Sequence, residues 1–243
     1  MKKTTLTSIA FLLLSFISFA QTSLYENPDF DQIATDHKII AILPFKATVE
    51  LRPKQMEKMT PDQFKELELS EGESIQNAMH SWFLKRKKRG TLSIDVMEPK
   101  RVNTLLLKEG ITVDNINGYT TEDLAQILGV DAIISGTYET NKPMSDGASI
   151  ALGVLIGFWG TTNSATVNMS VNNAKDGQLL WNYNKKVRGS LGSSSDDLIN
   201  TLMRKASRRM AYTKYRLKLN RYEKYKTDFT FFRPLYRCSK CPK

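Results

Sequence analysis

The sequence predicts an α/β fold: a mixed β-sheet flanked by helices, with an antiparallel hairpin at the sheet edge and a basic C-terminal extension. An apolar run at 39–45 is typical of a buried strand. Residues 123–128 form an amphipathic pattern that passes through Gly129 into a second apolar run, which begins at Ile133. Glycine at this point is typical of a left-handed helix cap. The stretch 123–138 is therefore predicted to join a short helix to a buried strand.

Residues 1–20 are typical of an export signal. Two lysines near the start precede an apolar run at 9–19, and a cleavage site follows before Gln21. The run is shorter than the roughly 20 apolar residues of a membrane-spanning helix. No cysteine lies near Gln21, so lipid attachment is not expected there. We expect a cleaved signal peptide and a soluble exported chain, either periplasmic or associated with the outer membrane.

Charge is distributed unevenly along the chain. The formal net charge is +10, and it falls to +8 when Lys2 and Lys3 leave with the signal peptide. Residues 204–243 hold 14 basic and 2 acidic residues, a net charge of +12, which leaves −4 for residues 21–203. A mildly acidic body with a strongly basic tail predicts an arm that contacts an anionic surface. In an exported protein, the expected anions are lipid headgroups, cell-wall polymers or an acidic partner, and nucleic acid is not expected.

The first part of the mature chain alternates strands with helices. Residues 21–37 are a lead-in segment without sustained periodicity, and residues 47–69 form a polar loop with a short helix near 62–67. A capping-box spacing at 70–73 begins an amphipathic helix, which Gly90 ends. The apolar face of this helix consists of Ile75, Ala78, Met79, Trp82 and Phe83.

Five consecutive basic residues, 85–89, occupy the last turns of this helix. Cations there complement the helix dipole, and an anion-binding role is the alternative. A strand at 91–97 follows, and then a helix that begins at Pro99. This order predicts one sheet that contains strands 39–45, 91–97 and 131–139.

The second part is dominated by an antiparallel hairpin. Residues 174–178 form a turn signal between two alternating runs, 165–171 and 179–187. A capped helix begins near Ser193 and closes the α/β domain, which spans 38–212. Upstream, the apolar run at 150–159 contains glycines that disfavour a helix. This run is either a buried strand or flexible apolar loop, or half of a membrane-facing hairpin completed by residues 165–172.

Residues 213–243 form a basic, aromatic tail with a CxxC motif. Interleaved aromatic and basic side chains suit nucleic-acid bases or a membrane interface, and a helix that packs its tyrosines on the body is the alternative. Cys238 and Cys241 suit a disulfide, half of a metal site or free thiols, and an oxidising compartment favours the disulfide. The residues predicted to bind an anionic surface are Arg216, Lys218, Arg221, Lys224 and Lys226.

The sequence contains no pattern typical of catalysis. His37 and His80 have no patterned partner, and no glycine loop is followed by the lysine of a phosphate site. Asp131 lies at the helix-to-strand joint, where an aspartate more often accepts backbone N–H groups than acts as a catalyst. We therefore expect a protein that is not an enzyme and that uses neither a cofactor nor a metal.

Five short motifs stand out in the sequence: 40–45, Trp82-Phe83, 102–106 with Gly110-Ile111, 128–137 and the hairpin residues 176–181. Together they resemble the cell-envelope superfamily that includes the penicillin-binding-protein activator lipoproteins and the curli secretion pore protein. The resemblance spans about residues 38–212 and implies a sheet flanked by helices that works as a non-catalytic binding module at the cell envelope. This chain departs from the superfamily at two points. Many relatives are lipid-anchored through an amino-terminal cysteine, which this chain lacks, and the pore proteins need two membrane hairpins, whereas this sequence offers at most one.

These observations predict a non-catalytic exported protein that acts as a protein-interaction module in an envelope assembly. The expected partner is another envelope protein or assembly, with anionic lipid or cell-wall polymer as a further contact and self-association as an option. The alternative is a component of an outer-membrane pore or secretion complex that uses an apolar hairpin at 150–172.

Overall fold

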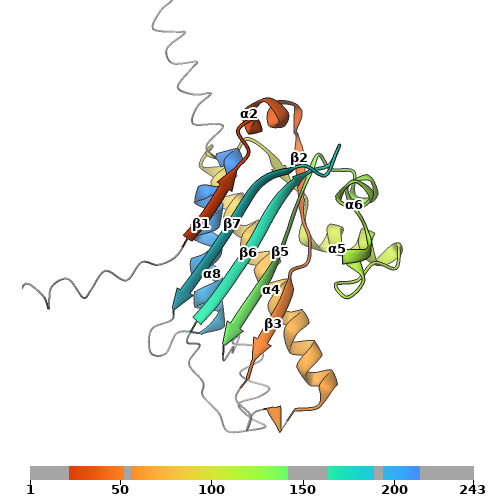
Figure 1. Cartoon of the computed structure of the whole chain (residues 1–243), viewed down its shortest axis with the longest axis vertical. Coiled ribbons are helices and arrows are strands. Elements are labelled where there is room, and N and C mark those ends of the chain that lie inside the picture. The colour runs from red at the N-terminus through yellow and green to blue at the C-terminus, as the bar shows by residue number, and fades with distance from the viewer. Residues whose placement is uncertain (1–21, 52–55, 58, 142–163, 189–193, 214–243) are drawn as a thin grey trace, which may run out of the picture.

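The computed structural model describes residues 22–51, 56–57, 59–141, 164–188 and 194–213 (Figure 1). The strands are β1 (Thr22–Glu26), β2 (Ile39–Ile42), β3 (Lys46–Glu50), β4 (Asp95–Val96), β5 (Ala132–Asn141), β6 (Ser164–Asn173) and β7 (Leu179–Arg188). The helices are α2 (Phe30–Ile33), α4 (Pro61–Lys88), α5 (Pro99–Lys108), α6 (Thr121–Leu128) and α8 (Ser195–Arg209), with short 3-10 helices η2 (Ala34–Asp36) and η3 (Ile116–Gly118).

All the described strands belong to one mixed sheet. Their order is β1-β7-β6-β5-β2-β4, and β3 continues from β2 to pair with the second half of β5. Pairing is parallel among β2, β3, β4 and β5, and antiparallel among β5, β6, β7 and β1. The predicted mixed sheet and the predicted hairpin are both confirmed. β1, which the lead-in segment supplies, extends the sheet beyond the hairpin.

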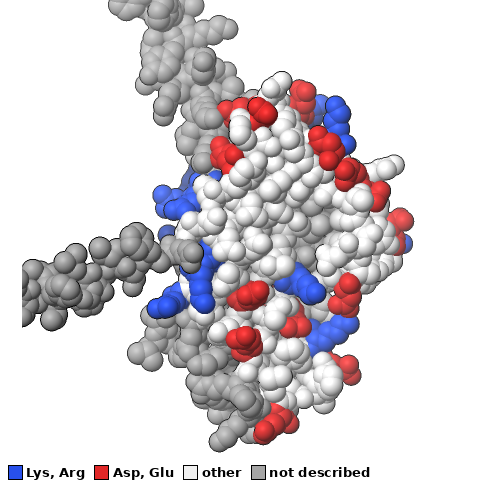
Figure 2. Space-filling model, in the orientation of Figure 1, with Lys and Arg blue, Asp and Glu red and all other residues white. Residues whose placement is uncertain are grey.

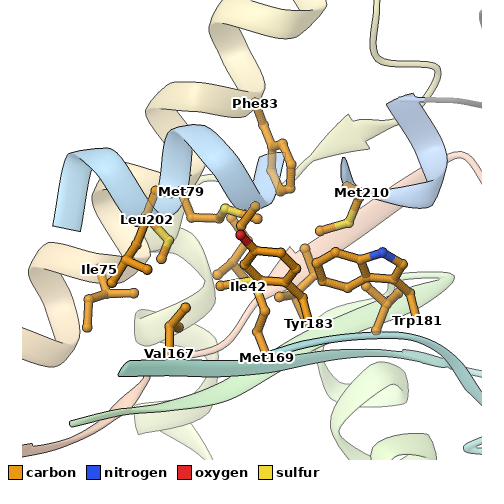
Figure 3. Packing of buried hydrophobic residues seen from close by; sticks show 14 of the residues in the cluster. Ile42, Ile75, Met79, Phe83, Val167, Met169, Trp181, Tyr183, Leu202 and Met210 are labelled. Atoms are coloured by element: carbon orange, nitrogen blue, oxygen red, sulfur yellow. The ribbon is translucent and has the colours of Figure 1, made fainter. Parts of the chain in front are cut away.

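Two pairs of helices lie on opposite faces of this sheet. α4 and α8 pack on each other and cover one face, behind the sheet in Figure 1. Their apolar side chains and those of the strands form the main core, part of which is shown in Figure 3. α5 and α6 cover the other face at β2 and the start of β5, where a smaller core forms.

The main core is closed by large side chains of the hairpin and the helices. Trp181 is fully buried, stacks on Tyr183 with ring centroids 5.5 Å apart, and donates its indole N–H to the Arg209 carbonyl at 3.1 Å. In Figure 3, Met79 and Phe83 of α4 face this cluster from the helical side. Because the helices and the hairpin share this cluster, they are expected to fold as one unit.

The corner between β2 and β3 depends on two glycines. Phe45 is buried at this corner between α4 and the sheet. A Cβ on Gly72 of α4 would lie 2.3 Å from the Phe45 carbonyl oxygen. On the other side, a Cβ on Gly136 of β5 would lie 2.6 Å from the Phe45 ring. Only glycine leaves room for the chain to pass here.

The helix-to-strand joint is confirmed. α6 begins with a capping box between Thr120 and Asp123, and Gly129 follows its last turn with φ 65° and ψ 48°. This left-handed conformation is one that a residue with a Cβ resists. The chain then enters β5 directly.

Some predicted boundaries are wrong. The helix expected from 70–73 is the second part of α4, which begins at Pro61 because Thr60 and Gln63 form a capping box upstream. The segment 47–69, which was predicted as a polar loop, contains most of β3 and the first turns of α4. The predicted strand 91–97 pairs only at Asp95–Val96.

The apolar run at 150–159 lies outside the described residues. Its suggested hairpin partner, 165–172, belongs to β6 and pairs with strands on both sides. The apolar side chains of β6 are buried in the main core, so they do not face a membrane. No helix within the described ranges has the length and apolar composition to cross a membrane.

Candidate interaction face

One face of the sheet is covered by helices along only part of its length. Successive strand residues point to opposite faces, so each strand contributes one set of side chains to the main core and one set to the other face. Beyond the region under α5 and α6, no described helix covers this second set (Figure 1). We name it the open face: Ser23, Tyr25, Lys46, Thr48, Glu50, Ser135, Thr137, Glu139, Asn141, Ser164, Thr166, Asn168, Ser170, Asn182, Asn184, Lys186 and Arg188.

The composition of the open face is unusual for a β-sheet. Eleven of its 17 residues are Ser, Thr or Asn, and four of those are asparagines, a residue that is depleted in strands. Asn182 Nδ2 donates to Asn168 Oδ1 at 3.1 Å, and the hydroxyls of Ser135 and Ser170 lie 3.2 Å apart. These pairs form a ladder of short, neutral hydrogen-bonding groups across three strands.

Charges lie toward the two sides of the open face. Lys186 and Arg188 are on β7, whereas Glu139 is on β5 and Glu50 on β3. Figure 2 shows basic side chains on the β7 side next to acidic side chains toward β5 and β3, with a largely uncharged area above them. Lys46 adds one positive charge on β3.

A groove of about 310 Å³ runs where the open face meets the layer of α5 and α6. Its floor is polar and includes Ser135, Thr137 and Lys46. Its wall is largely apolar and includes Ile116 and Tyr119, and Tyr119 is 39% exposed. A partner that lies on the open face therefore also meets a recess with an apolar side.

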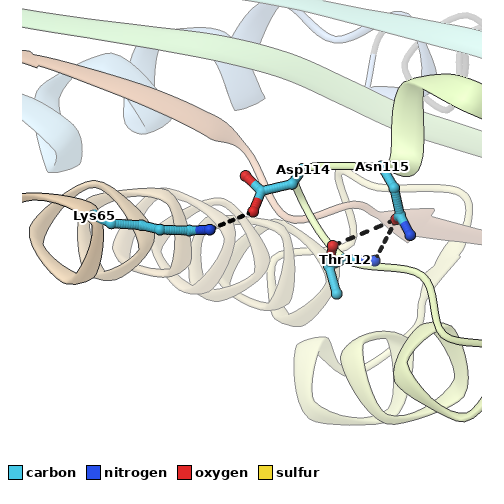
Figure 4. A network of polar contacts seen from close by, with 4 residues as sticks. All are labelled: Lys65, Thr112, Asp114 and Asn115. Atoms are coloured by element: carbon cyan, nitrogen blue, oxygen red, sulfur yellow. Dashed lines mark hydrogen bonds and ion pairs between the residues drawn. The ribbon is translucent and has the colours of Figure 1, made fainter. Parts of the chain in front are cut away.

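Polar contacts hold the loop that forms this wall (Figure 4). Lys65 Nζ of α4 lies 2.6 Å from Asp114 Oδ2. Asn115 Oδ1 accepts a hydrogen bond from the Thr112 backbone N–H at 2.7 Å, and Asn115 Nδ2 donates to the Gly110 carbonyl at 2.9 Å. The loop is thus fixed at both its ends before η3 begins.

A second hollow, of about 840 Å³, lies at the end of the sheet that carries the turn between β6 and β7. It is lined by residues of α2, η2, α6 and the β6–β7 turn, including Asp36, Glu122 and Asp176. Asp131 in its wall accepts the backbone N–H groups of Lys38 and Ile39 at 2.7 and 2.9 Å, which confirms the structural role predicted for this carboxylate.

The two histidines are also held by the fold. His37 Nδ1 lies 2.7 Å from the Tyr212 hydroxyl, and burial lowers the His37 pKa from its ordinary value despite nearby carboxylates. Burial likewise lowers the pKa of His80. A neutral imidazole nitrogen can accept a hydrogen bond from the Tyr212 hydroxyl, so His37 ties the start of the sheet to the end of the described chain.

The helical side of the molecule carries a basic patch. Arg86 of α4 donates to Ser207 Oγ at 3.0 Å and to the Arg204 carbonyl at 3.4 Å, which joins the basic end of α4 to α8. Burial, followed by the charges of Arg208 and Arg89, lowers the Arg86 pKa. Both basic segments, 85–89 and the start of 204–243, are visible in the sequence. That they lie side by side is not.

The predicted tail residues lie outside the described residues. These are the anionic-surface residues Arg216, Lys218, Arg221, Lys224 and Lys226, and the pair Cys238 and Cys241. Among the residues that are described, no group of three or more His, Cys, Asp or Glu side chains could hold a metal ion. Sequence reasoning missed the open face, although its polar residues alternate with the apolar ones that predicted the hairpin.

Comparisons with known proteins give structural neighbours only. No family model matches the chain, and no curated protein matches it. The PelC dodecamer from Paraburkholderia phytofirmans is similar at 10% identity over 78% of this chain and 98% of that one, with a TM-score of 0.41. Lipoprotein GNA1162 from Neisseria meningitidis is similar at 17% identity over 71% of this chain and 96% of that one, with a TM-score of 0.40.

The C-terminal domain of LpoB from Salmonella enterica is also similar, at 8% identity over 67% of this chain and 94% of that domain, with a TM-score of 0.31. With identities of 17% or less and TM-scores of 0.41 or less, these three likenesses carry no argument about what this chain does.

Proposed function

We propose that this chain is a non-catalytic, exported protein that acts as a protein-interaction module in a cell-envelope assembly, with the open face as its contact surface. The composition of that face carries the proposal. Asparagine is depleted in strands, yet four asparagines lie on the open face. Their side chains bury no apolar surface and so do not stabilise the core. Their benefit is expected in binding, where neutral donors and acceptors at fixed spacing can match another protein surface.

The groove beside the open face supports the same proposal. Interfaces combine a polar rim with aromatic and apolar anchors in recesses. Tyr119 and Ile116 line such a recess directly beside Ser135 and Thr137. Fixed groups also lose little conformational entropy on binding, and the contacts of Asp114 and Asn115 hold this wall in place.

Photocrosslinking in intact cells tests this proposal. A photoreactive residue in place of Asn184, in the open face, should yield a crosslinked species, whereas one in place of Thr104, exposed on α5, should not. Equal yields at the two positions, or a species only at Thr104, would contradict the proposed surface. Detergent-free fractionation separates the alternative class: the proposed module stays in the periplasmic extract, and a pore component sediments with membranes.

We also propose that the basic tail adds contact with an anionic surface. The basic patch of Arg86, Arg204 and Arg208 supports this, because it extends cationic surface along α8 towards the point where the tail begins. A chain that ends at Thr213 should remain folded and lose binding to anionic vesicles. Neutral vesicles serve as the control.

Glutamine replacement of Arg216, Lys218, Arg221, Lys224 and Lys226 separates charge from aromatic packing, because the tyrosines remain. Binding of the unaltered chain should weaken as salt rises, since the Debye length is about 8 Å at physiological ionic strength and shrinks further above it. Salt-insensitive binding that survives the glutamine variant would contradict the electrostatic arm. Unfolding of the shortened chain would show that the tail packs on the body.

A further inference from the structure

The open face is complementary to itself in charge. We propose that it binds a second copy of this chain face to face, about a two-fold axis that runs parallel to the strands. This inference rests on the proposed function, since it names the partner that the open face accepts. It follows from the register of the strands and from the positions of four charged side chains.

Strand register places the charges of the open face in two rows across the sheet. Lys186 on β7 pairs with Thr166, which pairs with Glu139 on β5. In the next row, Arg188 on β7 pairs with Ser164, which is joined through Asn141 to Glu50 on β3. Each row is therefore basic at its β7 end and acidic at its β5 or β3 end.

A two-fold axis parallel to the strands brings opposite charges together. Rotation about such an axis exchanges the two sides of the face but keeps each row at its own height along the strands. With the axis between β5 and β6, Arg188 of one copy faces Glu50 of the other, and Lys186 faces Thr48, directly beside Glu139. An isologous interface makes each of these contacts twice.

Other arrangements do not produce this match. An in-plane axis perpendicular to the strands would place the rows of Lys186 and Arg188 over the rows of Asn168 and Ser170, so that Lys186 and Arg188 would face Asn184 and Asn182 and no acidic side chain. With the parallel axis, Lys46 faces Asn184, so no like charges meet. The uncharged centre brings Ser, Thr and Asn side chains of both copies together, and these groups can both donate and accept hydrogen bonds.

The size of the open face predicts a weak dimer. Strands about 4.8 Å apart and residues about 3.4 Å apart give a plane of roughly 500 Å² on each copy. Interfaces of standard size bury about 800 Å² on each partner. Association is therefore expected to depend on concentration and on salt, because charge pairs supply much of its specificity.

Sedimentation of the full chain at increasing concentration tests this proposal. The unaltered chain should show a monomer–dimer equilibrium in 0.1 M salt that shifts to monomer in 1 M salt, where the Debye length falls from about 10 to about 3 Å. Lys186→Glu with Arg188→Glu should weaken the dimer at least about tenfold through like-charge repulsion. Glu139→Lys with Glu50→Lys should do the same. Asp62→Lys should not, because Asp62 is exposed in the first turn of α4, away from the open face.

Mixing the two charge-reversed variants is the decisive step. Each variant alone should be monomeric, and an equal mixture should form a heterodimer, because each acidic side then faces a basic one. A monomeric unaltered chain, or a mixture that stays monomeric, would overturn the inference. If it fails while crosslinking from Asn184 still captures a different protein, the proposed function stands and only the choice of a second copy is wrong.

Discussion

The two faces of the sheet are built from the same strands but differ in what their side chains achieve. On the side of α4 and α8, alternate residues such as Val167, Met169 and Trp181 are fully buried and hold helices to strands. On the open face, their immediate neighbours Asn168 and Asn182 bond to each other across the strands. One face specifies the fold, and we propose that the other specifies the partner. Substitutions at adjacent positions should therefore have separable effects on stability and on binding.

The largest effect is expected from Trp181→Ala in the main core. Loss of the buried ring should lower the free energy of unfolding by about 3–5 kcal/mol, as large-to-small core substitutions do. The next residue along β7 gives the matched control, because Asn182 points to the open face. Asn182→Ala should change stability by about 0.5 kcal/mol, the range of surface substitutions. Chemical denaturation of the two variants measures this difference, and equal losses would contradict the two-face comparison.

A smaller effect is expected at the joint between α6 and β5. Gly129→Val should destabilise the chain by about 1–2 kcal/mol, because a left-handed conformation costs a residue with a Cβ about that much. Gly118→Val is the control, since that glycine has no positive φ and a Cβ there would meet nothing within 4 Å. A thermal melt distinguishes them. An unchanged melting temperature for Gly129→Val would refute the joint between α6 and β5.

The smallest effect concerns pH. Burial lowers the His37 pKa below 6.5, so the unfolded chain binds a proton more readily than the folded one. The stability that neutral His37 contributes to the free energy of unfolding is therefore fully present above about pH 6.5, and it decreases as the pH falls below that value. His37→Gln should flatten the decline in melting temperature between pH 7.5 and 5.5. A decline that is as steep in the variant would show that other groups cause it.

Much of the fold was predictable because local patterns and tertiary packing agree. Gly129 and the apolar face of α6 define the joint, and the turn at 174–178 defines the hairpin. The start of α4 was missed because two capping boxes compete in the sequence, and the one at Thr60 lies outside the apolar pattern that guided the prediction. β1 was missed because it buries little and depends on pairing with β7.

The candidate site was predictable only in part. The sequence shows the polar half of an alternating strand at Thr166, Asn168 and Ser170. Such polar residues usually indicate only that one face of the strand is exposed to solvent. Which strands lie beside β6, and whether a helix covers them, is decided by long-range pairing. The meeting of Arg86 with α8 depends on packing in the same way.

The most direct test of the account inserts one bulky side chain into the open face. Asn168→Trp should leave the melting temperature within a few degrees of the unaltered chain, because this position does not contribute to the main core. The same substitution should abolish the species captured by a photoreactive residue at position 184. Retained crosslinking in a folded Asn168→Trp variant would contradict the claim that the open face is the contact surface.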